Sequence, residues 1–410
     1  MHDMRHVLAR LQTLRGKFEG LLASAHKKAA RAPDDRPTGL RELTGFGSNP
    51  GNLRMFAYAP PHLPRKAPLV VALHGCTQTA EDYDRGSGWS SLADRLGFAV
   101  VYPQQQPANN PKSCFTWFLP GDITRGQGEA LSIKQMVEHA IATFAADRSK
   151  VFVTGLSAGG AMACVMLATY PEVFAGGAII AGLPYGCAGN AQQAFEAMFA
   201  ERGHGAQALG DRVRGASGCR GPWPKISVWH GAGDPIVKPS NCEDIIRQWT
   251  NVHGLSDSPS YRESIGSHSR RVWSDAKGNA LIEAVSIAGM AHGVPLATAT
   301  GAESCGAAGA FFLDVGISST HQITRFWGLE ESLGEQPRTA APAPQVSAEA
   351  SVAEGEERQS HAPDPNDVIA AAFKAAGLSV PPQTSSGATR RADPGSIIAA
   401  ALKAAGLAQR

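Results

Sequence analysis

The 410-residue sequence contains no apolar stretch long enough to cross a membrane and no block of basic residues. A membrane-spanning helix needs about 20 consecutive apolar residues, so we expect no transmembrane segment. The net charge is only +2, with Lys and Arg spread along the chain, which argues against nucleic acid as a partner. With 43% hydrophobic and 18% charged residues, the composition is typical of a globular protein.

The N-terminal segment, residues 1–37, lacks the uninterrupted apolar core of a secretory signal peptide. Its apolar residues recur at helical spacing instead. They are Val7, Leu8, Leu11, Leu14, Phe18, Leu21 and Leu22. We therefore expect an amphipathic helix that packs on its own domain rather than on a membrane surface. The missing signal predicts a cytoplasmic protein, and secretion is the alternative.

The seven cysteines form no C-x-x-C pair and no metal-ligand spacing, so we expect no metal site. Cys164 lies within an apolar segment and is predicted to be a small core residue. The other six could form disulfides, which would be unusual in a cytoplasmic protein. They are Cys76, Cys114, Cys187, Cys219, Cys242 and Cys305.

Residues 38–329 alternate apolar, β-rich runs with helical segments. The runs end near Gly75, Pro103, Gly155, Leu183, Gly231 and Ile287, and helical periodicity covers Leu131–Ala146, Ala158–Tyr170 and Cys242–His253. Continuous apolar strands that alternate with helices predict an α/β fold, with a mainly parallel sheet covered on both faces. Ligands of such sheets bind at the carboxyl ends of the strands.

The composition changes after Leu329. Residues 330–363 are rich in Ala, Pro, Glu, Ser and Gln, which predicts a disordered linker. A repeat follows at 364–378 and 393–407, with eleven of fifteen positions identical. Each copy begins with Asp-Pro and ends with Gly-Leu, so each predicts a short helix. Two interpretations stay open: the helices dock on a partner, on a polymer surface or on the enzyme itself, or they form a tail with no partner.

A G-x-S-x-G motif, Gly155–Gly159, lies between a predicted strand and a predicted helix. This is the context of a nucleophile elbow, in which a sharp turn presents a reactive serine. Ser157 is therefore the candidate nucleophile. The alternative is that the glycines only mark a loop.

A serine nucleophile needs a base that is oriented by a carboxylate, and both should follow it in the chain. Asp234 comes just after a predicted strand, and His292 follows the next one. We predict that these residues complete the site. Other acidic and histidine residues do not fit strand ends in this way and are rejected as candidates. They are Asp244, His230, His253 and His268.

The oxyanion of an acyl-transfer reaction needs two N–H donors. One is predicted to be the backbone N–H of Ala158, directly after the nucleophile. The other is expected in the loop after an early strand, at Cys76, with Thr77 as the alternative donor. Gly75 would allow the backbone to approach a substrate closely.

These motifs resemble those of the poly(3-hydroxybutyrate) depolymerase-type esterases, which are related to feruloyl and acetylxylan esterases. The resemblance rests on LHGCTQ, CFTWFLPGDITRGQGE, GLSAGGAMA, HGAGDPIVKPSN and GMAHGVP. It implies an α/β-hydrolase fold and maps the nucleophile, carboxylate and base onto Ser157, Asp234 and His292. It also suggests a disulfide between Cys76 and Cys114.

The resemblance further suggests that Trp117 and Phe118 line an acyl or polymer groove, with Thr77 nearby; the alternative is that the aromatics belong to the core. We expect a serine esterase that acts on poly- or oligo(3-hydroxybutyrate) without a cofactor or metal. A short-chain esterase of the feruloyl or acetylxylan type is the alternative. A third alternative is a protein of a different class, which binds polyester granules through its C-terminal repeats.

Overall fold

The computed structural model describes residues 2–28, 38–199, 205–299, 301 and 303–330, and for residues 2–11, 27 and 28 it describes only the helical backbone. The chain divides into two units, Met1–Arg338 and Thr339–Arg410, and every described residue belongs to the first. The predicted repeats and almost all of the predicted linker lie outside the described residues, so the docking of the repeats stays a prediction. None of the helices within the described ranges is long and apolar enough to span a membrane.

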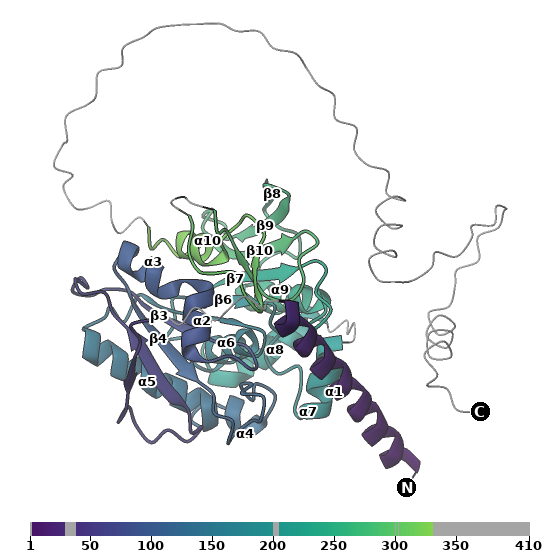
Figure 1. Ribbon diagram of the computed structural model, residues 1–410. Coiled ribbons are helices and arrows are strands. Elements are labelled where there is room, and N and C mark those ends of the chain that lie inside the picture. Colours follow the sequence, from purple (N-terminus) through teal and green to yellow (C-terminus); the bar gives the residue numbers. More distant parts are fainter. Residues whose placement is uncertain (1, 29–37, 200–204, 300, 302, 331–410) are drawn as a thin grey trace, which may run out of the picture. The chain divides into compact units, whose positions relative to one another are not determined.

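The domain is built around a ten-stranded sheet in the order β1-β2-β4-β3-β5-β6-β7-β10-β9-β8 (Figure 1). Neighbours from β4 to β10 in this order are parallel, and both flanks are antiparallel. The central strands are β4 (Ala99–Gln104), β3 (Leu69–Leu73), β5 (Val151–Leu156), β6 (Gly176–Ile180), β7 (Lys225–Gly231) and β10 (Ala280–Ile287). The prediction of a mainly parallel sheet is confirmed.

The flanking strands and a small second sheet were not anticipated. They are β1 (Arg41–Leu43), β2 (Arg54–Tyr58), β8 (Tyr261–Ile265), β9 (His268–Ser274) and the parallel pair β11 (Val294–Leu296) and β12 (Phe312–Asp314). Strand β8 has four exposed residues in five, so it carries no apolar run. Central strands such as β3 are buried throughout, and their continuous apolar sequence made them recognisable.

Helices cover both faces of the sheet, as two adjacent glycines of β6 show. A Cβ atom added at Gly177 would lie 2.5 Å from Leu167 of α6 (Ala158–Thr169), whereas one at Gly176 would lie 3.3 Å from Trp327. Successive residues of a strand point to opposite faces. Helix α6 therefore covers one face, and Trp327, which follows α10 (Ser319–Phe326), covers the other.

The remaining helices complete these layers. They are α1 (His2–Lys28), α2 (Ala80–Ser87), α3 (Trp89–Leu96), α4 (Pro120–Ile123), α5 (Gly128–Phe144), α7 (Ala191–Phe199), α8 (Ala206–Ser217) and α9 (Ser240–His253). Helix α1, purple in Figure 1, packs on α7 of its own domain, where the buried Phe18 meets the Phe195 ring edge-on at 5.7 Å.

Candidate active site

Ser157 occupies the turn between β5 and α6. Its backbone has φ 58° and ψ −116°, in a region that residues with a side chain rarely adopt. The Ser157 N–H donates a hydrogen bond to the Ile180 carbonyl of β6 at 2.8 Å, which fixes the turn against the sheet. A strained serine between a strand and a helix is the geometry of a nucleophile elbow.

The glycines on either side of Ser157 allow this turn to pack. A Cβ atom at Gly155 would lie 2.4 Å from the backbone of Gly159, and one at Gly159 would lie 2.3 Å from the Leu73 carbonyl oxygen. These contacts involve backbone atoms, which cannot move aside as the end of a side chain can. The motif therefore has a steric requirement for glycine at both positions, beyond simple loop flexibility.

Asp234 and His292 are brought together by neighbouring parallel strands. Asp234 follows β7 and His292 follows β10, and the last residues of these strands, Gly231 and Ile287, are paired in register. His292 Nδ1 lies 2.6 Å from Asp234 Oδ2. Because carboxyl ends of parallel strands meet at one edge of the sheet, two residues 58 positions apart in the chain become a hydrogen-bonded pair.

The Asp234 carboxylate is fixed on both of its oxygens. Oδ1 accepts the backbone N–H groups of Ile236 and Val237, at 2.8 and 3.0 Å. Oδ2 faces His292 and also lies 3.3 Å from His230 Nε2. Burial by itself would raise the pKa of Asp234, but the two histidines and their hydrogen bonds outweigh burial and hold the pKa well below its usual range. Asp234 is therefore a carboxylate at neutral pH.

Ser157 and His292 line the same small cavity. Its other lining residues are Leu22, Gly75, Cys76, Gln78, Leu156 and Phe311. Ser157 is 7% exposed and His292 is 5% exposed, so both are nearly covered. The two side chains, both within the described residues, are not hydrogen-bonded to each other, and a hydrogen bond between a nucleophile and its base often tightens only when a substrate binds.

Two backbone N–H groups next to this cavity are available as donors. Ala158 is the first residue of α6, so its N–H has no carbonyl partner within the helix. On the facing loop, the Gly75 N–H donates to the Gln78 side chain at 2.8 Å and the Thr77 N–H donates to the Lys112 carbonyl at 2.7 Å. The Cys76 N–H between them has no acceptor among the described residues. Thr77, the alternative donor, is thus engaged elsewhere.

The loop that carries Cys76 is tied down on both sides. Cys76 forms a disulfide with Cys114, as the family resemblance suggested. His74 Nδ1 donates to the Gly75 carbonyl at 2.7 Å, and its Nε2 accepts the Gln105 N–H at 3.1 Å. Burial lowers the pKa of His74 to about 4, so the imidazole is neutral and can make both bonds at once.

The three predicted substrate-binding residues do not line the cavity. Trp117 is buried in the core, and Phe118 packs edge-on against it at 5.4 Å. The Thr77 hydroxyl donates to the Cys76 carbonyl at 2.5 Å. Leu22 and Phe311 form the apolar wall instead. Neither belongs to a motif, and only the amphipathic pattern of the N-terminal helix gave a signal for Leu22.

The rejected candidates lie in other environments, with one partial exception. Asp244 pairs with Arg247 at 2.7 Å, and the ring nitrogens of His253 and His268 contact the carbonyls of Pro224 and Val315, at 3.1 and 3.2 Å. His230 is the exception, because it adjoins Asp234. Within the described ranges, no three His, Cys, Asp or Glu side chains are grouped as a metal site requires.

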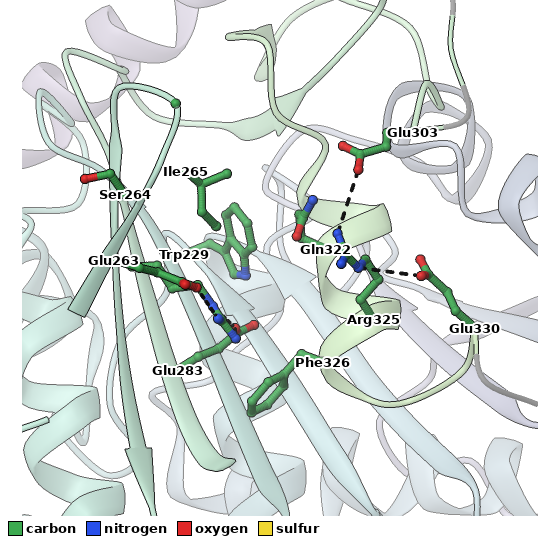
Figure 2. A pocket seen from close by; sticks show the side chains of 12 residues that line it. Trp229, Glu263, Ser264, Ile265, Glu283, Glu303, Gln322, Arg325, Phe326 and Glu330 are labelled. Atoms are coloured by element: carbon green, nitrogen blue, oxygen red, sulfur yellow. Dashed lines mark hydrogen bonds and ion pairs between the residues drawn. The ribbon is translucent and has the colours of Figure 1, made fainter. Parts of the chain in front are cut away.

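A second pocket lies between the β7–β10 part of the sheet and α10 (Figure 2). Arg270 pairs with Glu263 and Glu283 at 2.5 and 2.7 Å. On its other side, Arg325 lies between Glu303 and Glu330, at 3.8 and 3.6 Å. The pocket is polar, its charges are paired, and it contains none of the candidate site residues.

Comparison with known proteins gives a consistent set of relatives. Residues 53–273 match the family described as esterase PHB depolymerase. The chain is 52% identical over 291 residues to poly(3-hydroxyalkanoate) depolymerase C of Paucimonas lemoignei, which covers 71% of this chain and 70% of that protein. It is 37% identical over 271 residues to an acetylxylan esterase of Coprinopsis cinerea, covering 64% of this chain and 71% of the relative.

A solved structure has the same fold. The acetyl xylan esterase from Aspergillus awamori superposes with a TM-score of 0.61 at 27% sequence identity, covering 71% of this chain and 99% of that one.

Proposed function

Because the chain belongs to the esterase PHB depolymerase family, we propose that it hydrolyses poly- or oligo(3-hydroxybutyrate) esters through Ser157, His292 and Asp234. The family predicted from the motifs, the α/β-hydrolase fold and the hydrolase class are confirmed by the relatives. The substrate and the roles of the individual residues are the proposal. The observation that carries the substrate is the 52% identity over 291 residues to a poly(3-hydroxyalkanoate) depolymerase.

Ser157 begins the proposed reaction. Its Oγ attacks the ester carbonyl carbon, and the π electron pair of the carbonyl moves onto oxygen. Since Asp234 occupies Nδ1 of His292, Nε2 is the nitrogen left to take the serine proton. The negatively charged Asp234 stabilises the imidazolium that results and keeps the ring oriented.

The N–H groups of Cys76 and Ala158 hold the negative oxygen during this step. His292 then gives its proton to the leaving alcohol oxygen as the carbon–oxygen bond breaks, and an acyl-enzyme remains on Ser157. Water attacks the acyl carbon with His292 again as base, which releases the acid and restores the serine. Donors fixed before the reaction contribute most of such catalysis, because they need no reorganisation when the charge develops.

A short-chain esterase of the acetylxylan or feruloyl type is the second candidate. It is favoured by the 37% identity to an acetylxylan esterase and by the solved acetyl xylan esterase with the same fold. Both candidates use the same chemistry and differ in the alcohol and acyl parts of the substrate.

Hydrolysis of p-nitrophenyl butyrate, a 3-hydroxybutyrate oligomer and acetylated xylan would test the proposal. We expect activity on the first two that is lost in Ser157→Ala. Ser149→Ala is the matched control, because Ser149 is an exposed serine whose N–H and hydroxyl both donate to the Asp147 carboxylate. This variant should keep full activity. Cleavage of acetylated xylan but not of the oligomer would favour the second candidate, and full activity of Ser157→Ala would overturn the mechanism.

A further inference from the structure

The N-terminal helix α1 contacts the domain through several side chains in its second half. Phe18 packs edge-on against Phe195, and Lys17 Nζ lies 4.8 Å from the centre of the Phe199 ring. Both aromatic partners belong to α7, beside which α1 runs in Figure 1. Residues four apart share a face of a helix, so the face that carries Phe18 also carries Leu22 and His26.

The last turns of this face reach the catalytic cavity. Leu22 lines the cavity together with Ser157 and His292, and it is 7% exposed. One turn later, the His26 ring meets the Phe311 ring edge-on at 5.4 Å, and Phe311 in turn meets His292 edge-on at 6.0 Å. Helix α1 therefore contributes Leu22 to the wall of the cavity, and through His26 it contacts a second wall residue, Phe311.

Two bulky apolar residues of the cavity wall, Leu22 and Phe311, come from elements other than the ends of β3 and β5. Phe311 is constrained, because its backbone has φ 64° and its carbonyl accepts the Val294 N–H at 2.8 Å. Leu22, in contrast, belongs to the regular α-helix α1. Leu22 is not part of the loop that carries His292, so its side chain can be exchanged without altering the sequence of that loop.

We propose that α1 is a wall of the substrate cavity and that Leu22 is a specificity-determining residue, which limits the length of the acyl group that Ser157 can accept. The proposal rests on the proposed role of Ser157 as nucleophile. An apolar pocket typically discriminates between substrates by about 10- to 200-fold for each methylene that it fits or excludes. Removing most of the Leu22 side chain should thus shift the preference toward longer acyl chains.

The test measures kcat/KM for p-nitrophenyl acetate, butyrate and octanoate. In Leu22→Ala the octanoate-to-acetate ratio should rise about tenfold, and in Leu22→Trp it should fall about tenfold. Leu21→Ala is the matched control, because Leu21 packs on the core from the same helix but does not line the cavity. Its ratio should stay within about twofold of the wild type.

The proposal is overturned if neither Leu22 variant changes the ratio, or if Leu21→Ala changes it as much as Leu22→Ala does. Thermal melts show whether each variant is folded, and if Leu22→Ala is not, Leu22→Val and Leu22→Trp decide the question. Ser157→Ala separates this proposal from the proposed function. If Ser157→Ala is fully active, the assignment of Ser157 as nucleophile is wrong. If it is inactive and the octanoate-to-acetate ratios of the Leu22 variants equal that of the wild type, only the proposed role of Leu22 is wrong.

Discussion

Thr116 contacts the buried carboxyl group of Glu129 twice, through its backbone N–H at 2.9 Å and its hydroxyl at 2.6 Å. The same hydroxyl lies 2.6 Å from a carboxylate oxygen of Asp122. A hydroxyl has a single hydrogen to donate, so both contacts are hydrogen bonds only if one carboxyl group carries a proton. Burial raises the pKa of Glu129 to about 8, which places that proton on Glu129 at neutral pH.

Glu129→Gln should therefore flatten the dependence of stability on pH. The folded-state pKa of about 8 exceeds the unfolded value of about 4.3. Stability from this group is complete below the unfolded pKa and is lost as pH rises through the folded pKa. Melting temperatures measured between about pH 5 and pH 9 should fall more steeply in the wild type than in the glutamine variant.

Glu172→Gln is the control for this experiment, because Glu172 lies on the surface in an ion pair with Arg125. It should reproduce the wild-type slope. Parallel curves for wild type and Glu129→Gln would mean that Glu129 is not the proton carrier.

Asp234→Asn should lower kcat on p-nitrophenyl butyrate by about 10,000-fold, because the amide cannot stabilise the imidazolium or select the tautomer of His292. The low pKa of Asp234 keeps the carboxylate charged across the usual assay range, so the effect should persist at each pH tested. Asp244→Asn serves as control, since that aspartate pairs with Arg247 on α9, and its kcat should be close to wild type. A loss below about tenfold in Asp234→Asn would argue against the assigned role.

Cys114→Ser should weaken both stability and catalysis, because it releases the loop that carries the Cys76 N–H. The disulfide joins residues 38 positions apart, and closing a loop of that size stabilises a protein by about 3 to 4 kcal/mol. We expect kcat to fall about tenfold, a part of the 100- to 1,000-fold that complete loss of an oxyanion donor costs. Urea melts and esterase assays provide the two measurements.

Cys219→Ser supplies the comparison for this variant, since Cys219 is a free cysteine. It should match the wild type, and dithiothreitol should lower the kcat of Cys219→Ser about tenfold but have no further effect on Cys114→Ser. An enzyme that is indifferent to dithiothreitol would show that the disulfide does not position the loop.

Gly159→Ala should destabilise the protein by about 1 to 3 kcal/mol, because the added carbon overlaps the Leu73 carbonyl of β3 and the backbone would have to shift. Gly215→Ala makes the same chemical change in α8, where a Cβ atom meets nothing within 4 Å. It should instead stabilise by about 0.5 to 1 kcal/mol. Chemical denaturation of both variants distinguishes the steric cause from a general effect of replacing glycine, and equal shifts would refute it.

The sequence allows the core of the sheet to be predicted, because buried parallel strands have short, continuous apolar runs bounded by turn residues. Strands such as β3 and β7 were recognised for this reason. Strand β8 was missed, because its four exposed residues are placed by pairing with β9, a long-range effect that leaves no local pattern.

The candidate site likewise contains residues that the sequence predicts and residues that it does not. Ser157, Asp234 and His292 each follow a recognisable strand, so their motifs and positions predicted that they would meet. Leu22 and Phe311 reach the cavity through the packing of α1 and through the loop that precedes β12. Trp117 lies in the core, which was the alternative to a groove position, and the sequence could not decide between the two because a motif aromatic has the same letter whether it faces substrate or core.

Strands β5, β7 and β10, which position Ser157, Asp234 and His292, belong to one hydrogen-bonded series, β5-β6-β7-β10, in which β6 lies between β5 and β7. The peptide that links α9 to β8 lies outside this arrangement, and residues 256–258 within it are exposed. A protease that cuts there would separate His292 covalently from the other two residues while sheet pairing keeps them together. Full esterase activity is therefore poor evidence that a preparation is intact, and a denaturing gel should accompany every assay.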